Sequence, residues 1–310
     1  MQRIQYHRYG GPDVMRLEPF ELTTPAAGEV AVKVRFAAVN PIDWKLRSGQ
    51  MKIVTGNAFP RAMGMDFAGT VIAVGEGVTR FAPGDPVFGL APFKQTGALS
   101  EGVIAKASAL ARKPDEVSFE QAACLGTAGV TAWNGLVDKA GVTAGQHVFI
   151  NGCAGAVGEA AVQIARMRGA TVLGSCSARD IDRVRQLGVE TVFDYRATSP
   201  ADIAARFDIV YDTAASMSVA EGLGLLRKGG VFIDLNPSPG KFLAAAFNRR
   251  LKLVICTPRP DVLDALARAA VAANFRLPIG EIAPLGEAIN LITALETGRK
   301  LGGKAVIRMD

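Results

Sequence analysis

The sequence predicts an α/β protein in which a doubly wound parallel sheet is joined to a strand-rich domain. From about residue 120, short apolar runs alternate with helical segments, whereas residues 1 to about 115 carry alternating strands and turns without a dominant helix. Between the first apolar run and its helix lies a turn with three glycines, Gly152, Gly155 and Gly158. The length of 310 residues is enough for two domains.

Alternating apolar and polar residues, separated by turn residues, predict the strand-rich part. Residues 29–36 alternate as a half-buried strand, residues 69–75 form a second, and the Pro-Gly turn at 83–84 leads into a third. The parallel sheet is predicted from five apolar runs, at 148–150, 171–176, 191–193, 209–211 and 231–235.

The last part of the chain need not belong to the parallel sheet. It holds a predicted helix at 262–274, an apolar-periodic segment at 285–295 and a final strand at 304–308. We therefore place the domain boundaries after residues 118 and 258, which gives segments 1–118, 119–258 and 259–310.

The glycine turn has the context that a dinucleotide needs. Glycines let the backbone approach a pyrophosphate, and the following helix offers unpaired N–H groups to it. The spacing is G-x-x-G-x-x-G rather than the commoner G-x-G-x-x-G, and a tight turn without a ligand also uses glycine. We predict a dinucleotide site formed at the turn by Gly152, Ala154, Gly155, Ala156 and Val157.

The end of the next strand predicts which dinucleotide binds. NAD sites usually place an acid there, about 20 residues past the glycines, but the position holds Cys176 and no carboxylate follows until Asp180. Ser177 and Arg179 supply the hydroxyl and cation that a 2′-phosphate needs, so NADPH is the predicted cofactor. Taken alone, Arg179 is better explained as a solvated residue at the start of the following helix, and it is the missing acid together with the Ser-x-Arg arrangement that favours NADPH. Tyr195 either packs on the ribose-phosphate or is structural.

Composition excludes several other classes of protein. The chain is 49% apolar and 21% charged, with a formal net charge of +6 from scattered basic residues that show no nucleic-acid-binding signature. No apolar run reaches the roughly 18 residues of a membrane span, and the first residues do not resemble a signal peptide. The four cysteines are far apart, as in a reducing compartment, so a cytoplasmic protein is expected.

Several short motifs together resemble one family over almost the whole chain. They lie at residues 9–12 (YGGP), 40–45 (NPIDWK), 64–69 (GMDFAG), 128–133 (AGVTAW), the glycine turn and 303–304 (GK). The sequence resembles the zinc-independent quinone oxidoreductase and alkenone reductase branch of the medium-chain dehydrogenase/reductases. That resemblance implies a GroES-like catalytic domain, completed by the C-terminal segment, and a Rossmann domain, with the active site in the cleft between them.

The residue types favour a protein without zinc. The resemblance aligns the catalytic zinc ligands of the alcohol dehydrogenases with Asn40, Met65 and Thr127, none of which is a normal zinc ligand. The two histidines are remote from these motifs, and Asp66, beside Met65, has no further ligand residue near it in the sequence. No four-cysteine loop exists either, so we expect no metal.

Chemistry without a metal favours reduction of an activated C=C bond. Reduction of a saturated carbonyl needs a group to polarise the oxygen, which zinc provides in the relatives. Conjugate hydride transfer to an α,β-unsaturated carbonyl or quinone needs only a few hydrogen-bond donors aimed at the developing enolate.

The resemblance assigns the candidate catalytic residues. Asn40 and Thr127 should line the nicotinamide end of the cofactor, with Thr127 holding the carboxamide. Lys45 shares a predicted short helix with Asp43. It either acts in catalysis, by donating a hydrogen bond to the enolate or relaying a proton, or it forms an ion pair with Asp43 that supports the loop. Asn236 either lies near the nicotinamide or simply forms part of an ordinary turn.

Two other functions remain open at this point. One is an enoyl-thioester reductase of a biosynthetic pathway, and the other is a non-catalytic NADPH-binding sensor or adaptor, since fold does not fix function. Family analogy also predicts a homodimer joined through the edge strand of the Rossmann sheet.

Overall fold

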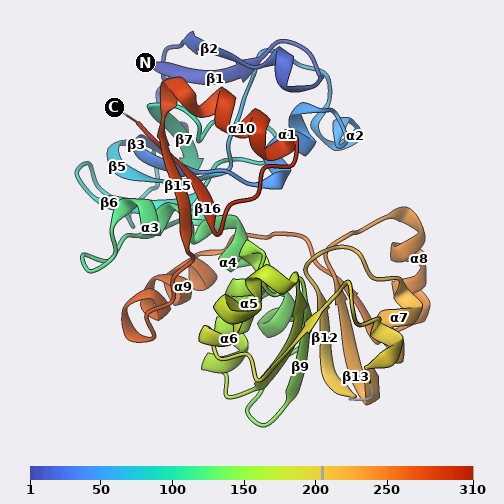
Figure 1. Cartoon of the computed structure of the whole chain (residues 1–310). Helices are drawn as coiled ribbons and strands as arrows, with labels where there is room; N and C mark the ends of the chain where they lie inside the picture. The colour runs from blue at the N-terminus through green and yellow to red at the C-terminus, as the bar shows by residue number, and fades with distance from the viewer. Residues whose placement is uncertain (204–205, 310) are drawn as a thin grey trace. The chain divides into compact units, whose positions relative to one another are not determined.

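The structure, a computed structural model, describes residues 1–203 and 206–309. The chain forms two compact units (Figure 1). The first contains Met1–Thr127 and Pro258–Asp310, and the second contains Ala128–Thr257. The first unit extends past residue 118 because the helix α3 (Phe119–Ala123) packs on two of its strands, β3 (Glu29–Ala38) and β5 (Asp66–Val74).

The first unit is built on two sheets. A three-stranded sheet has the order β2-β1-β4, and a seven-stranded sheet has the order β15-β16-β3-β5-β6-β8 with β7 paired to β3. The remaining strands are β1 (Gln2–Tyr6), β2 (Arg16–Pro19), β4 (Arg61–Ala62), β6 (Pro86–Leu90), β7 (Gly102–Lys106), β8 (Leu110–Arg112), β15 (Ile279–Pro284) and β16 (Lys304–Arg308). Its other helices are α1 (Pro41–Arg47), α2 (Lys52–Thr55), α9 (Pro260–Ala272) and α10 (Ala288–Glu296).

Strand register brings three distant segments of the first unit together. Ala38, the last residue of β3, lies opposite Asp66 at the start of β5 and opposite Val306 of β16. Since β16 belongs to the C-terminal segment, the end of the chain completes this sheet. Positions 40, 66 and 304 are therefore neighbours although they are far apart in the sequence.

The second unit is the predicted doubly wound parallel sheet. Its strand order is β11-β10-β9-β12-β13-β14, so successive strands run outward in both directions from β9. The strands are β9 (His147–Asn151), β10 (Thr171–Cys176), β11 (Thr191–Asp194), β12 (Phe207–Asp212), β13 (Leu226–Asp234) and β14 (Leu251–Leu253). The helices are α4 (Gly126–Trp133), which begins in the first unit, then α5 (Ala156–Met167), α6 (Ile181–Gln186), α7 (Val219–Gly224) and α8 (Pro239–Phe247).

Right-handed crossovers explain how the helices cover this sheet. The direction of strand order reverses between β10 and β12, so the connections on either side of β9 must lie on opposite faces. Figure 1 accordingly shows α5 and α6 on one side of the sheet and α7 and α8 on the other. The reversal is the place where ligands bind in open α/β sheets.

The α/β fold class is confirmed, and the predicted elements agree closely with the structure. The predicted strands at 171–176 and 304–308 are β10 and β16, and the helix predicted at 262–274 is α9, which begins earlier, at Pro260. The segment predicted at 285–295 opens with a 3₁₀ turn (Leu285–Glu287) before α10. Among the described residues, no helix is both long and apolar enough to span a membrane.

Candidate active site

Asn40 lies directly after β3 and caps the first turn of α1. Its backbone N–H donates to Asp43 Oδ2 at 2.8 Å, and Pro41 takes the first helical position, where a missing N–H costs no helical hydrogen bond. The short helix predicted to carry Asp43 and Lys45 is therefore confirmed as α1.

The carboxylate of Asp66 is the acceptor around which this site is organised. Asn40 Nδ2 donates to Asp66 Oδ2 at 2.9 Å and to the Ala38 carbonyl at 3.1 Å. Both the backbone N–H and the hydroxyl of Thr127 donate to Asp66 Oδ1, at 2.8 and 2.5 Å. A Cβ at Gly126 would lie 2.6 Å from the same oxygen, so only glycine lets the backbone approach Asp66 this closely.

Lys304 brings a buried positive charge to these residues. It opens β16, its side chain is 4% exposed, and its Nζ donates to Asn40 Oδ1 at 2.5 Å and to the Val39 carbonyl at 3.2 Å. Nζ also lies 3.9 Å from Asp66 Oδ2. Because lysine has only donors, it fixes Oδ1 as the atom facing it and so sets the orientation of the Asn40 amide.

The site contains two buried acids for one buried cation. Burial raises the pKa of Asp43 to about 7, and the nearby charge of Asp66 adds to the rise, while the Asn40 N–H and Lys304 oppose it. Burial also raises the pKa of Asp66, against the effect of Lys304 and of the hydrogen bonds from Thr127 and Asn40. A proton on Asp43 therefore balances the buried charge near neutral pH.

We expect one aspartate carboxyl to titrate near pH 7 in carbon-13 NMR spectra, and Asp43→Asn to remove that resonance. An acid whose pKa is raised by folding contributes stability below its unfolded-state pKa and loses it as the pH rises through the folded-state pKa. Asp43→Asn should therefore raise the melting temperature more at pH 8 than at pH 5. The matched control Asp182→Asn, with an acid that is 91% exposed, should leave the resonance in place. Absence of any carboxyl midpoint above pH 6 in the wild type would contradict this reading.

The glycine turn between β9 and α5 uses its three glycines differently. Gly152 has φ +80°, and a Cβ on Gly158 would lie 2.2 Å from the Gly152 carbonyl oxygen, so packing within the turn explains both residues. Gly155 caps α5 at φ −82°, and its Cβ would meet nothing closer than 3.4 Å. The N–H groups of Ala156 and Val157 follow in the first helical turn, where the helix provides no acceptor. An anionic group fits this end of α5, because unpaired donors and the positive end of the helix dipole meet there.

Comparison with known proteins identifies the family. Residues 26–115 match the alcohol dehydrogenase GroES-like domain, and residues 156–235 match the family called zinc-binding dehydrogenase. A chloroplastic quinone-oxidoreductase homolog of Spinacia oleracea is 31% identical over 80% of this chain and 79% of its own length. The chain belongs to the quinone oxidoreductase branch of the medium-chain dehydrogenase/reductase superfamily.

Two further relatives agree with this family. A 2-methylene-furan-3-one reductase of Solanum lycopersicum is 31% identical over 99% of this chain and 79% of its own length. The structure of the quinone oxidoreductase from Coxiella burnetii has a TM-score of 0.91 at 29% identity, and the match covers 100% of this chain and 99% of that one.

In this member of the quinone oxidoreductase branch, three of the four predicted catalytic residues lie together. Asn40, Asp43 and Thr127 share the hydrogen-bond network described above, whereas Lys45 is exposed on α1. The placement of the two residues does not favour an Asp43–Lys45 ion pair, since Asp43 is buried, Lys45 is exposed, and residues two apart on a helix do not face each other.

Two residues of the network were missed as functional residues in the sequence. Asp66 had been considered only as a metal ligand and judged to have no partners, but it accepts hydrogen bonds from Asn40 and Thr127 and lies beside Lys304. The available signal was charge beside two predicted strands, since Asp66 precedes the strand predicted at 69–75 and Lys304 opens the strand predicted at 304–308; a buried ion is rare unless it is paired. In the described parts of the chain, no group of three or more His, Cys, Asp or Glu side chains is arranged to hold a metal.

The end of β10 carries Cys176, Ser177 and Arg179 at three different degrees of exposure. Cys176 is 3% exposed, so its side chain faces the interior. Ser177 and Arg179 follow at the surface, and the Arg179 side chain is 62% exposed. The predicted cation is therefore accessible, whereas Ser177 is only partly exposed.

The other two predicted cofactor residues also lie near strand ends of the second unit. Tyr195 directly follows β11, is 53% exposed, and has the Arg196 guanidinium 5.0 Å from its ring centroid. Asn236 follows β13, and its backbone N–H donates to Asp234 Oδ1 at 2.6 Å. Both residues thus stand at the carboxyl edge of the parallel sheet.

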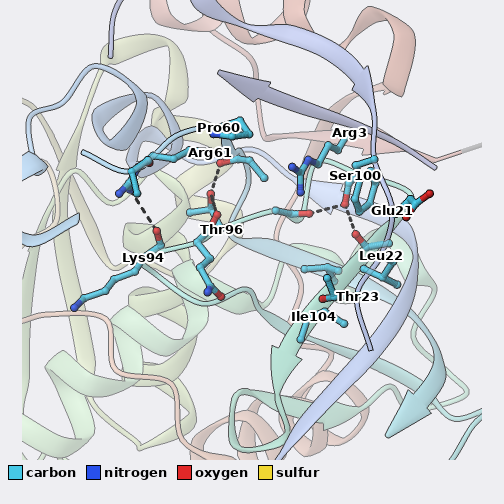
Figure 2. A pocket seen from close by; sticks show the side chains of 17 residues that line it. Arg3, Glu21, Leu22, Thr23, Pro60, Arg61, Lys94, Thr96, Ser100 and Ile104 are labelled. Atoms are coloured by element: carbon cyan, nitrogen blue, oxygen red, sulfur yellow. Dashed lines mark hydrogen bonds between the residues drawn. The ribbon is translucent and has the colours of Figure 1, made fainter. Parts of the chain in front are cut away.

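A cavity of about 350 Å³ in the first unit contains none of the predicted site residues (Figure 2). Its lining includes Arg3, Phe20, Arg61, Lys94, Thr96 and Ser100. Arg61 donates to the Ala58 carbonyl at 2.8 Å, and the Ser100 hydroxyl lies 2.6 Å from the carbonyls of Gly97 and Gly102. Since these polar groups hold the chain's own backbone, we assign the cavity no ligand.

Proposed function

We propose that this protein is a zinc-independent, NADPH-dependent reductase of α,β-unsaturated carbonyls or quinones. The observation that carries the proposal is the β9–α5 turn, where Gly155 leaves space at a helix end with unpaired N–H groups. The names of the relatives from Spinacia oleracea and Solanum lycopersicum support the substrate class. The alternative substrates are enoyl thioesters.

We propose that the cofactor is bound mainly by the second unit. The pyrophosphate would be held by Gly152, Ala154, Gly155, Ala156 and Val157. Ser177, Arg179 and Tyr195 would bind the 2′-phosphate end, and Asn40, Thr127 and Asn236 the nicotinamide end. A bound dihydronicotinamide supplies the hydride.

The residues of the first unit prepare the reaction by orientation. Because the Thr127 hydroxyl donates a hydrogen bond to Asp66, its oxygen can accept a hydrogen bond from the carboxamide N–H of the nicotinamide. Both donors of the Asn40 amide and its carbonyl oxygen are engaged by the protein, so Asn40 would line the nicotinamide end as a positioning residue and donate no side-chain hydrogen bond to the cofactor.

The reaction also requires a proton for the substrate after hydride transfer. Lys45 is the exposed cation on α1, and we propose that it donates a hydrogen bond to the substrate oxygen as negative charge develops there. Solvent or Lys45 then delivers the proton to the α-carbon.

The test is NADPH oxidation at 340 nm with an alkenone, a 1,4-quinone, a saturated ketone and an enoyl thioester, each repeated with NADH and with a metal chelator. We expect turnover of the alkenone or quinone, faster with NADPH, and no effect of the chelator. Turnover of only the saturated ketone, lost with chelator, would overturn the proposal. NADPH binding without any turnover would favour the sensor or adaptor function.

We also propose a cytoplasmic homodimer. The four cysteines are free thiols, which suits a reducing compartment. β14 is an edge strand of the parallel sheet, and an edge strand offers unpaired backbone groups to a second copy. Sedimentation velocity would show a species of twice the chain mass of 32.6 kDa.

A further inference from the structure

The carboxylate of Asp180 gathers the groups that would bind a 2′-phosphate. The Ser177 hydroxyl donates to Asp180 Oδ2 at 2.7 Å, and Arg179 Nε lies 3.4 Å from the same oxygen. Arg183, one turn further along α6, donates to Asp180 Oδ1 at 3.1 Å. The proposed phosphate donors are therefore already directed at an anion that belongs to the chain.

Arg183 connects this group to the glycine turn. Its guanidinium donates to the Ala154 carbonyl at 3.2 Å and forms an ion pair with Glu159 in the first turn of α5. The Glu159 side chain is only 3% exposed, and the Arg183 side chain is 28% exposed. Arg183 thus spans the two βα turns that flank the adenosine part of a dinucleotide in this fold.

The charges of the cluster balance without a ligand. Arg179 and Arg183 carry two positive charges, and Asp180 and Glu159 carry two negative charges. A 2′-phosphate brings up to two more negative charges to the same donors, whereas a ribose 2′-hydroxyl brings none and can donate to the carboxylate. The cluster as it stands therefore penalises the phosphate relative to the hydroxyl.

We infer that Asp180 is a specificity-determining residue, whose carboxylate competes with the 2′-phosphate of the cofactor for Ser177, Arg179 and Arg183. Binding of a phosphate then requires these donors to leave Asp180, and like-charge repulsion opposes its approach. The inference rests on the proposed cofactor site, and it makes Asp180 the residue that limits the preference for NADPH over NADH.

The test compares two probes that differ only by the 2′-phosphate, adenosine 2′,5′-bisphosphate and adenosine 5′-monophosphate. Their dissociation constants are measured by calorimetry on the full-length wild type and on Asp180→Asn. Asparagine keeps the shape of the side chain and removes its charge. We expect the bisphosphate to bind about tenfold more tightly to Asp180→Asn, with the monophosphate changed by less than about twofold.

Asp182→Asn is the matched control, because it removes the same charge from a side chain that is 91% exposed and pairs with Arg185. It should leave the ratio of the two affinities unchanged. An equal shift in both variants would show a general charge effect and overturn the inference.

Arg183→Met gives an independent test. If Arg183 leaves Asp180 to donate hydrogen bonds to the 2′-phosphate, its loss should weaken binding of the bisphosphate about tenfold more than binding of the monophosphate. Equal weakening of both probes would instead assign Arg183 only to holding the turn. If both probes bind but the ratio of their dissociation constants is the same in Asp180→Asn as in the wild type, the inference about Asp180 is wrong and the cofactor site still stands. If neither probe binds to the wild type, both the proposed cofactor site and the inference are wrong.

Discussion

Replacing Lys304 with methionine is expected to lower the free energy of unfolding of the first unit by about 3 kcal/mol. The substitution leaves the Asp66 carboxylate, which is 0% exposed, without the only buried cation that lies within 4 Å of it in the described structure. It also removes the donor to Asn40 Oδ1, and a buried acceptor left without its partner adds to the cost. Turnover should fall with stability, because the Asn40 amide is no longer held in one orientation.

The measurement is urea denaturation followed by the fluorescence of Trp44, which lies in the first unit. Trp133 lies in the second unit, so a Trp133→Phe background isolates the signal. Lys300→Met is the control, since Lys300 is exposed in the segment just before β16. Unfolding of Lys304→Met at the wild-type midpoint would show that the buried pair contributes nothing to stability.

A double variant separates charge from packing. Asp66→Asn removes the buried negative charge, so Asp66→Asn with Lys304→Met should be more stable than Lys304→Met alone. An asparagine at 66 can still accept from the Thr127 hydroxyl and N–H through its amide oxygen. If the double variant is less stable than the single one, the charge argument is wrong.

The sequence predicted five of the six strands of the parallel sheet, because each is a local feature, and missed only the short edge strand β14 (Leu251–Leu253). β10 in this sheet and β16 in the first unit were predicted at their observed ends, since β-branched or apolar runs bounded by turn residues need no knowledge of the rest of the chain. The two segments of the first unit are joined by pairing of β16 with β3, which local patterns do not contain.

The candidate site was predicted only in part for the same reason. Asn40 and Thr127 came from motifs, but their common partner Asp66 and the cation Lys304 meet them only through strand register. The contacts of Ser177 with Asp180 depend on a 3₁₀ turn (Ala178–Asp180) that folds the carboxylate back over the strand end. Periodicity does not predict such a turn.

The glycine turn provides the second large effect, because two substitutions in it should separate structure from ligand binding. Gly158→Ala places a Cβ 2.2 Å from the Gly152 carbonyl and 2.8 Å from Cys153 Cα, and backbone must move to relieve the contact. We expect the second unit to lose about 2 kcal/mol or more of stability. We also expect NADPH to bind at least about tenfold more weakly.

Gly155→Ala should behave differently. Its Cβ makes only an ordinary contact at 3.4 Å and the backbone at φ −82° accepts any residue, so the free energy of unfolding should change by no more than about 1 kcal/mol. If the pyrophosphate lies against this backbone, the added methyl group occupies its place, and NADPH affinity falls about tenfold or more at nearly unchanged stability. Fluorescence titration with NADPH and thermal melting of the same samples measure both quantities. Wild-type affinity in Gly155→Ala would mean that Gly155, like Gly152 and Gly158, serves the turn and not a ligand. Loss of affinity without loss of stability would show that the added methyl group displaces the dinucleotide, since the nearest protein atom to that Cβ, the Gly152 carbonyl oxygen, lies at an ordinary contact distance of 3.4 Å.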